Sequence, residues 1–281
     1  MKKFIYPFLL AIYFNTPCLA DNVILMIGDG MGKNHITCTA KTTPLFLPTL
    51  KIKGDVTTYS ASHTITDSAA GATAYSCGLK TNNSYLALDS NKTPCETLAE
   101  MSVKNGFKTL IRTTDVITGA TPAAFYAHVD YRYKTQEIKE QLAKAQEQMD
   151  IKAVTHIDTE VKEVLAKLKK EKKPFFMMIE ESEIDKQSHN NNYQKMQEAL
   201  VRFDNAVKEA VNFAKRDKKT TVIVVADHET GGLTTHCNYT KNNHSSADVH
   251  YFAFGQHAKL FNQKVMDNTD IHHKIKQILF K

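Results

Sequence analysis

Two short segments of the chain pair a carboxylate with an imidazole in a way that suits a metal site. Asp185 and His189 are four residues apart, so on a helical turn both side chains would lie on one face and could bind one ion. The alternative for this pair is an exposed polar helix start. Asp227 and His228 directly follow the apolar run 221–226, where buried polar groups need a partner and a cation would satisfy both. Both pairs therefore predict metal binding.

Three further residues offer donors of the same kind, each with a structural alternative. Asp29 stands between Gly28 and Gly30, where an aspartate commonly serves a turn. Glu180 opens an acidic segment, and His244 would by itself be an exposed loop histidine. Taken together, the chain offers four carboxylates and three imidazoles. Oxygen and nitrogen donors in this number suit two zinc ions, with an additional all-oxygen position suited to magnesium.

A serine stands between an aspartate and a run of small residues in TDSAAGATA, residues 66–74. By position alone, a serine at a helix start is typical of an N-terminal cap. The free N–H groups of a helix N-terminus also favour negative charge, so the same position suits a nucleophile that receives an anionic group. The small residues after Ser68 leave room for that group. With metal-ligand residues elsewhere in the chain, we expect Ser68 to be the nucleophile.

Strands that alternate with helices must position these residues. Short apolar runs predict buried strands at 23–27, 109–111, 175–179 and 221–226. The predicted helices between or beyond them are 96–104, 135–148, 159–172 and 193–215. This alternation is typical of βαβ units, and it predicts an α/β three-layer sandwich with a mostly parallel central sheet.

The candidate ligands follow these predicted strands. In open α/β sheets the site lies beyond the carboxyl ends of the strands. Asp29, Asp185 and Asp227 each come after a different apolar run, so we expect them to converge on one edge of the sheet. Neither an internal repeat nor a linker rich in Pro or Gly divides the sequence. We therefore expect residues 21–281 to form a single catalytic domain.

The N-terminus has the order of a secretory signal peptide. Lys2 and Lys3 precede the apolar run 4–14, and small residues follow near Ala20. The apolar run is too short to cross a bilayer. We expect residues 1–20 to be a signal peptide, no membrane span after its removal, and a periplasmic or secreted protein.

Composition and charge narrow the class of partner. The 281 residues are 42% hydrophobic and 23% charged, with a formal net charge of +6. Many of the lysines lie in the block 162–173, which predicts a solvated helix face. Aromatic side chains are not interleaved with these charges, so we expect no nucleic-acid partner.

Four cysteines remain after the predicted signal peptide: Cys38, Cys77, Cys95 and Cys237. An even number in an exported chain permits disulfides. Cys77 and Cys95 are close in sequence and are the preferred pair. We expect no zinc on the cysteines, because no CxxC spacing occurs.

The set of motifs resembles the alkaline phosphatase family. The matching segments occur in that family's order and extend over most of residues 21–255. They are 29–32, 66–74, 121–124, Glu180 with 184–189, 226–232 and His244. The resemblance implies the fold of that family and the hydrolysis of small-molecule phosphate monoesters through a phosphoserine intermediate. It also implies two zinc ions and one magnesium ion.

The resemblance implies a role for each matching residue. Ser68 would be the nucleophile. Arg132, eleven residues after Thr121, would bind the phosphate with two parallel hydrogen bonds. From its place beside Ser68, we expect Asp67 to orient Arg132 rather than to bind a metal. The implied metal ligands are Asp185, His189 and His244 for the first zinc, Asp29, Asp227 and His228 for the second zinc, and Asp29, Thr121 and Glu180 for magnesium.

The chain departs from the family pattern near the implied magnesium position. Gly119 stands where some bacterial relatives carry an aspartate that helps to order the magnesium shell. We therefore expect Lys186 to lack an acidic neighbour there, and magnesium to bind more weakly than in those relatives. The chain is also short for the family. Insertions that elsewhere form dimer contacts look trimmed, which leaves a homodimer open.

Two other functions compete with a monoesterase. A phosphodiesterase or sulfatase of the same superfamily could use a similar metal site. Sulfatases need a C/S-x-P-x-R frame, whereas Ser68 is followed by Ala-Ala-Gly-Ala. Thr121, Glu180 and Arg132 favour monoesters over diesters. The rival from another class is a metal- or phosphate-binding protein without turnover.

Overall fold

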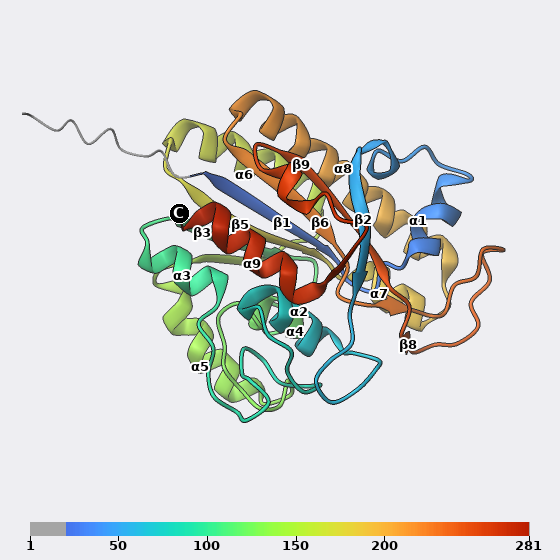
Figure 1. Ribbon diagram of the computed structural model, residues 1–281, viewed down its shortest axis with the longest axis horizontal. Coiled ribbons are helices and arrows are strands. Elements are labelled where there is room, and N and C mark those ends of the chain that lie inside the picture. Colours follow the sequence, from blue (N-terminus) through green and yellow to red (C-terminus); the bar gives the residue numbers. More distant parts are fainter. Residues whose placement is uncertain (1–20, 281) are drawn as a thin grey trace, which may run out of the picture.

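A computed structural model describes residues 21–280. The predicted signal peptide, residues 1–20, lies outside the described residues. The centre of the fold is an eight-stranded sheet with the order β10-β2-β9-β6-β1-β5-β3-β4 (Figure 1). Its strands are β1 Asn22–Gly28, β2 Ile52–Thr57, β3 Lys108–Thr113, β4 Asp150–Ala153, β5 Phe175–Glu181, β6 Thr220–Val225, β9 Val249–Gly255 and β10 Val265–Asp267.

The three strands at the middle of the sheet are the apolar runs of the sequence. Every residue of β1, β5 and β6 is buried. β1 pairs in parallel with β5 on one side and with β6 on the other. Strands buried on both faces need continuous rather than alternating apolar residues, which is the pattern that these segments carry. The prediction of a mostly parallel central sheet is confirmed.

Helices cover both faces of the sheet. Figure 1 shows α3 and α9 on one side and α6 and α8 on the other. The helices are α1 Lys33–Ala40, α2 Ser68–Cys77, α3 Leu98–Lys104, α4 Ala120–Ala123, α5 Thr135–Gln146, α6 Ile157–Glu171, α7 Glu183–His189, α8 Tyr193–Asp217 and α9 Asn268–Leu279. The four predicted helices correspond to α3, α5, α6 and α8, and their ends agree to within two residues. The lysine block lies mostly on the exposed face of α6, opposite Val161, Val164 and Leu168.

One edge of the sheet differs from a simple parallel arrangement. β9 runs antiparallel to both β6 and β2, and β2 pairs in parallel with the short strand β10. The smaller elements are η1 Leu47–Thr49, η2 Ala258–Phe261 and the two-stranded sheet of β7 Glu229–Thr230 and β8 His244–Ser245. None of the helices in the described part of the chain has the length and apolar character to cross a membrane.

The register of the central strands aligns their carboxyl ends. Ile27 of β1 is paired with Glu180 of β5 and with Val225 of β6. Glu180 is in turn paired with Thr113, the last residue of β3. The loops that leave these four strands therefore start side by side, which brings together segments that are far apart in the sequence.

Two disulfides tie the fold together. The predicted bond Cys77–Cys95 is present and joins the end of α2 to the segment before α3. A second bond, Cys38–Cys237, links α1 to the segment between β7 and β8.

Loss of the Cys38–Cys237 bond is expected to lower the free energy of unfolding by about 2–4 kcal/mol. The bond spans 199 residues of sequence, so its absence releases much chain entropy in the unfolded state. Urea denaturation of the Cys38→Ser/Cys237→Ser double variant measures the effect. The matched control is Cys77→Ser/Cys95→Ser, whose bond spans 18 residues and should cost less. An equal or larger loss in the control would contradict the expectation.

Candidate metal centre

Ser68 is the first residue of α2 and is 4% exposed. The residue that caps the helix is Asp67, whose Oδ1 accepts a hydrogen bond from the N–H of Ala70 at 3.0 Å. The alternative that Ser68 is the N-terminal cap of this helix is therefore wrong. Its hydroxyl faces the site instead, with Oγ 3.2 Å from Nε2 of His228.

Small side chains let α2 approach the site closely. A Cβ atom added at Gly71 would lie 2.9 Å from the carbonyl oxygen of Asp227 and 3.0 Å from its Cβ. Any larger residue at this position would push α2 and its first residue away from the loop that carries Asp227 and His228. The small residues after Ser68 thus fix the distance between the hydroxyl and the imidazole.

The loop after β1 and the loop after β6 bring Asp29, Asp227 and His228 together. Nε2 of His228 lies 3.4 Å from Oδ1 of Asp29 and 3.3 Å from Oδ2 of Asp227. Among the described residues, neither carboxylate oxygen has a hydrogen-bond partner, although both are buried. Buried carboxylate oxygens that lack a partner are costly unless a cation satisfies them, so this group fits a metal ion.

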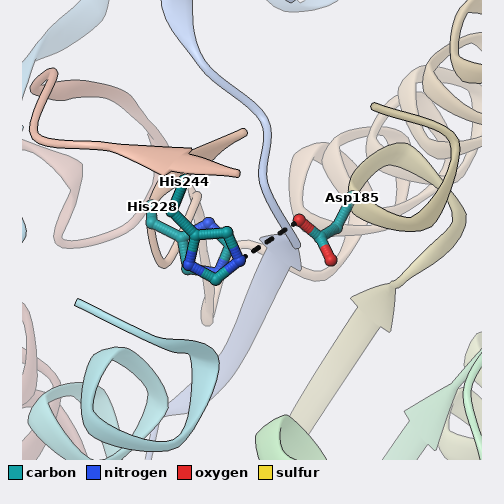
Figure 2. Close-up of side chains that lie close together, drawn as sticks. All are labelled: Asp185, His228 and His244. Carbon is teal, nitrogen blue, oxygen red and sulfur yellow. Dashed lines mark ion pairs between the residues drawn. The ribbon is translucent and has the colours of Figure 1, made fainter. Parts of the chain in front are cut away.

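A second group adjoins the first. Nε2 of His189 lies 3.3 Å from Oδ2 of Asp185 and 3.2 Å from Nε2 of His244. Figure 2 shows Asp185 facing the ring of His244, with 3.8 Å between Oδ1 and Nε2. The ring of His244 stacks on that of His228, with 3.5 Å between the centroids. All six predicted zinc ligands therefore lie in one continuous cluster, and His228 lies between its two halves.

Glu180 lies deeper, near the end of β5. Its Oε2 accepts a hydrogen bond from the hydroxyl of Thr113, and the hydroxyls of Thr113 and Thr121 both act to lower its pKa. Burial outweighs them and raises the pKa of Glu180 to about 8, helped by the charges of Asp115 and Asp227. The buried Oγ1 of Thr121 has no hydrogen-bond partner among the described residues and is close enough to act on Glu180, so the two residues fit the predicted magnesium position.

The carboxylates of the centre strongly affect one another. Burial and the charges of Asp227, Asp185 and Glu180 raise the pKa of Asp29 well above its ordinary value. Burial, together with the charge of Asp185, raises the pKa of Asp227 to about 7. Burial also opposes ionisation of Asp185, but hydrogen bonding to His189 and nearby imidazoles hold its pKa below the usual range.

The surroundings of His228, at the middle of the cluster, favour its neutral form. Burial lowers the pKa of His228 well below its ordinary value, and the charge of His244 lowers it further. Neutral imidazole is the form that binds a metal ion.

Arg132 extends toward the same edge from the loop before α5. Its Nη1 lies 3.3 Å from Oδ2 of Asp67, so the predicted contact between these residues is present. Burial acts to lower the pKa of Arg132, but the charges of Asp67 and Asp29 outweigh it and raise the pKa. The guanidinium therefore stays charged between α2 and the candidate metal centre.

Position 119 supplies no carboxylate to Lys186, as expected, but a different residue does. The Nζ atom of Lys186 lies 2.7 Å from Oδ1 of Asp115. Asp115 is the second residue after β3, so the strand-end rule that located the other carboxylates could also have located this one. The ion pair removes the reason to expect weak magnesium binding from Gly119 alone.

Other supporting residues carry no clear signal in the sequence. The hydroxyl of Thr230 donates a hydrogen bond to Oδ1 of Asp185. His35, buried in α1, lies with Nε2 3.0 Å from Oγ of Ser188, the neighbour of His189. These contacts hold α7 in place, but they depend on tertiary packing that no local pattern reveals.

The family model described as alkaline phosphatase matches residues 20–162 and 157–240. The chain belongs to the alkaline phosphatase family. The alkaline phosphatase of Schizosaccharomyces pombe is 39% identical over 130 residues, which are 42% of this chain and 24% of that one. The streptomycin-6-phosphate phosphatase of Streptomyces griseus is 39% identical over 128 residues, 41% of this chain and 28% of that one.

The matched part of this alkaline phosphatase family member thus spans less than a third of each curated relative. A solved structure agrees over more of its length. The alkaline phosphatase of the Antarctic bacterium TAB5 has a TM-score of 0.84 at 28% identity, and the match covers 92% of this chain and 97% of that one. The predicted family and fold are confirmed.

The unneutralised carboxylates give a testable pH dependence. Glu180 and Asp227 have folded-state pKa values of about 8 and about 7, against ordinary values of 4.5 and 3.8. Between these values each of the two carboxyls keeps a proton in the folded protein that it has lost in the unfolded chain, so each destabilises the fold as pH rises. The lowered pKa of His228 acts in the opposite direction, because it favours the neutral imidazole in the folded protein at a pH where the unfolded chain binds the proton. The Asp227 carboxyl alone should cost the metal-stripped protein about 2–3 kcal/mol of unfolding free energy between pH 5 and pH 8.

Urea denaturation of chelator-treated protein across this range measures the loss. Asp227→Asn is the matched variant, because Oδ1 of Asp227 already accepts hydrogen bonds from the N–H groups of Gly30 and His228 and an amide oxygen can keep them. Relative to the unmodified protein, the variant should gain stability by about that amount as pH rises from 5 to 8. An equal pH dependence in Asp227→Asn and the unmodified protein would contradict the raised pKa of Asp227.

Proposed function

We propose that the chain is a metal-dependent phosphatase that hydrolyses phosphate monoesters through a phosphoserine intermediate on Ser68. The observation that carries the proposal is the position of the Ser68 hydroxyl. It lies at a helix N-terminus, 3.2 Å from His228, at the edge where the candidate metal ligands and Arg132 gather. A phosphate group brought to this point would meet positive charge and free backbone N–H groups.

The donor set suits two zinc ions and one magnesium ion. Zinc would be held in one group by Asp185, His189 and His244, and in the other by Asp29, Asp227 and His228. Thr121 and Glu180, with Asp29, would hold magnesium. When bound, such ions lower the pKa of a serine hydroxyl and stabilise negative charge on the leaving oxygen.

The chain's own residues account for binding and transfer. Arg132 would donate two hydrogen bonds to the non-bridging oxygens of the phosphate, and Asp67 would keep the guanidinium in position. Oγ of Ser68 would attack phosphorus while the bond to the ester oxygen breaks, which releases the alcohol. Water would then cleave the phosphoserine, which restores the hydroxyl and releases inorganic phosphate.

The names of relatives support a monoester substrate and a metal requirement. One relative is named streptomycin-6-phosphate phosphatase. A variant of the TAB5 enzyme is described with Mg bound in its M3 site. The signal-peptide pattern of residues 1–20 and the two disulfides support export to the periplasm or the medium. We further propose that residues 21–281 form one catalytic domain.

Ser68→Ala is expected to lower kcat for para-nitrophenyl phosphate by at least about 1000-fold, because removal of a nucleophile leaves only residual catalysis. Release of para-nitrophenol by the purified, metal-loaded protein measures it. The bis-ester serves as the second substrate, and faster turnover of the bis-ester would indicate a phosphodiesterase. Stoichiometric phosphate uptake without product would indicate a binding protein. Equal monoesterase activity in Ser68→Ala would exclude the serine mechanism.

Arg132→Lys is expected to raise KM for the monoester about tenfold or more, since an ammonium group cannot supply the two parallel hydrogen bonds of a guanidinium. The positive charge is retained, so the variant tests geometry rather than charge. Inhibition by inorganic phosphate should weaken in parallel. An unchanged KM and unchanged phosphate inhibition would place Arg132 outside the phosphate site.

A further inference from the structure

The ion pair of Lys186 and Asp115 joins α7 to the loop after β3. Nζ of Lys186 lies 2.7 Å from Oδ1 of Asp115, and it also lies 3.1 Å from Oγ of Ser182. The two side chains are 41% and 27% exposed. This partial exposure makes the pair a modest contributor to stability, so its position is of more interest than its strength.

The space that Asp115 occupies exists because residue 119 is glycine. A Cβ atom at Gly119 would lie 2.3 Å from Oδ2 of Asp115 and 3.0 Å from the carbonyl oxygen of Val116. The φ angle of Gly119 is −61°, which any residue can adopt. Glycine is therefore needed here for space and not for its backbone freedom. The carboxylate of Asp115 fills the volume where a side chain at position 119 would begin.

Asp115 is connected to the Glu180 end of the centre. Its backbone N–H donates a hydrogen bond to Oγ1 of Thr113 at 2.8 Å, and the same hydroxyl donates to Glu180. The negative charge of Asp115 also contributes to the raised pKa of Glu180. Gly119 is the N-terminal cap residue of α4, the helix that carries Thr121. Asp115 thus lies between the segments that present Glu180 and Thr121.

We propose that Asp115 is a positioning residue for the magnesium position of Glu180 and Thr121. From four residues earlier in the chain, it supplies a carboxylate to the volume that Gly119 leaves open. That carboxylate holds Lys186 aside and provides the negative charge that attracts a divalent cation to this end of the centre. The inference rests on the proposed function, because the magnesium position is part of it.

The charges of the pair predict opposite effects on magnesium binding. Asp115→Asn keeps the size of the side chain and removes an anion, so we expect the Kd for magnesium to rise about tenfold. Lys186→Met removes a cation from the same place, so we expect the Kd to fall several-fold. A purely structural ion pair predicts the reverse for Lys186→Met, because loss of either partner would disturb the site in the same direction.

Isothermal titration calorimetry gives this readout without activity. Protein stripped by a chelator and reloaded with zinc would be titrated with magnesium chloride. The matched control is Glu171→Gln, which removes the anion of another partly exposed pair. In that pair Lys108 Nζ lies 2.6 Å from Oε2 of Glu171, and Lys108 stands at the opposite end of β3 from the site. The control should leave the Kd unchanged.

A separate set of variants tests whether Gly119 leaves the space that Asp115 fills. Gly119→Ala should displace the carboxylate of Asp115 and raise the Kd about as much as Asp115→Asn does. In a protein that already carries Asp115→Gly, the substitution Gly119→Ala should change the Kd for magnesium little further. The double variant Asp115→Gly/Gly119→Asp moves the carboxylate to position 119. It should bind magnesium more tightly than Asp115→Gly alone. Thermal unfolding of each variant checks that it is folded.

The outcomes separate this inference from the proposed function. If the unmodified protein takes up no magnesium, the magnesium assignment of the proposed function is wrong. If the unmodified protein binds magnesium and Asp115→Asn binds it equally well, only the role of Asp115 is overturned. Weaker magnesium binding in both Asp115→Asn and Lys186→Met would also overturn the role of Asp115, because the pair would then act only as a structural link.

Discussion

Mutual repulsion among buried carboxylates is the constraint on which the centre depends. Asp29, Glu180, Asp185 and Asp227 are at most 9% exposed and lie at one edge of one sheet. Burial and mutual repulsion keep the pKa values of three of them high. Such an arrangement destabilises a fold that holds no compensating charge. Divalent cations between the oxygens would supply that charge, so the metals of the proposed function would stabilise the fold as well as support its chemistry.

The rest of the structure supplies the rigidity that this arrangement needs. Parallel strands with aligned ends determine where each loop leaves the sheet, and their buried apolar residues hold the register. The close approach of α2 at Gly71 then fixes the hydroxyl of Ser68 against the same edge. Repulsion at the centre is thus opposed by a large apolar core that surrounds β1 on both faces.

Much of this could be predicted from the sequence, and for physical reasons. The runs 23–27, 175–179 and 221–226 are continuous and apolar because they become strands buried on both faces, and that pattern is local. The ten site residues were found partly by the rule that ligands follow such strands and partly through the resemblance to a family. Their convergence into one cluster is seen in the structure, whereas their roles as ligands and nucleophile remain proposals.

What the sequence did not predict depends on contacts between distant segments. β9 has apolar residues like the other strands, but its antiparallel pairing with β6 and β2 follows from the path of the loops. Asp115 was not singled out in the sequence, and Gly119 stood out only as a departure from the family pattern. Only the three-dimensional structure shows that one fills the space of the other. When one side chain fills the space left by a glycine elsewhere in the chain, no periodic pattern in the sequence reveals it.

The place of β1 in the sheet has a consequence for the order of folding. β1 is the first strand of the described chain, yet its two neighbours, β5 and β6, begin at Phe175 and Thr220. A ribosome therefore releases β1 long before either neighbour exists, and its mostly apolar residues have no neighbouring strand to pair with during that time. Long-range pairing of this kind slows folding and prolongs the exposure of aggregation-prone segments. Export in an unfolded state, which is part of the proposal above, would let the chain fold as a whole and avoid that delay.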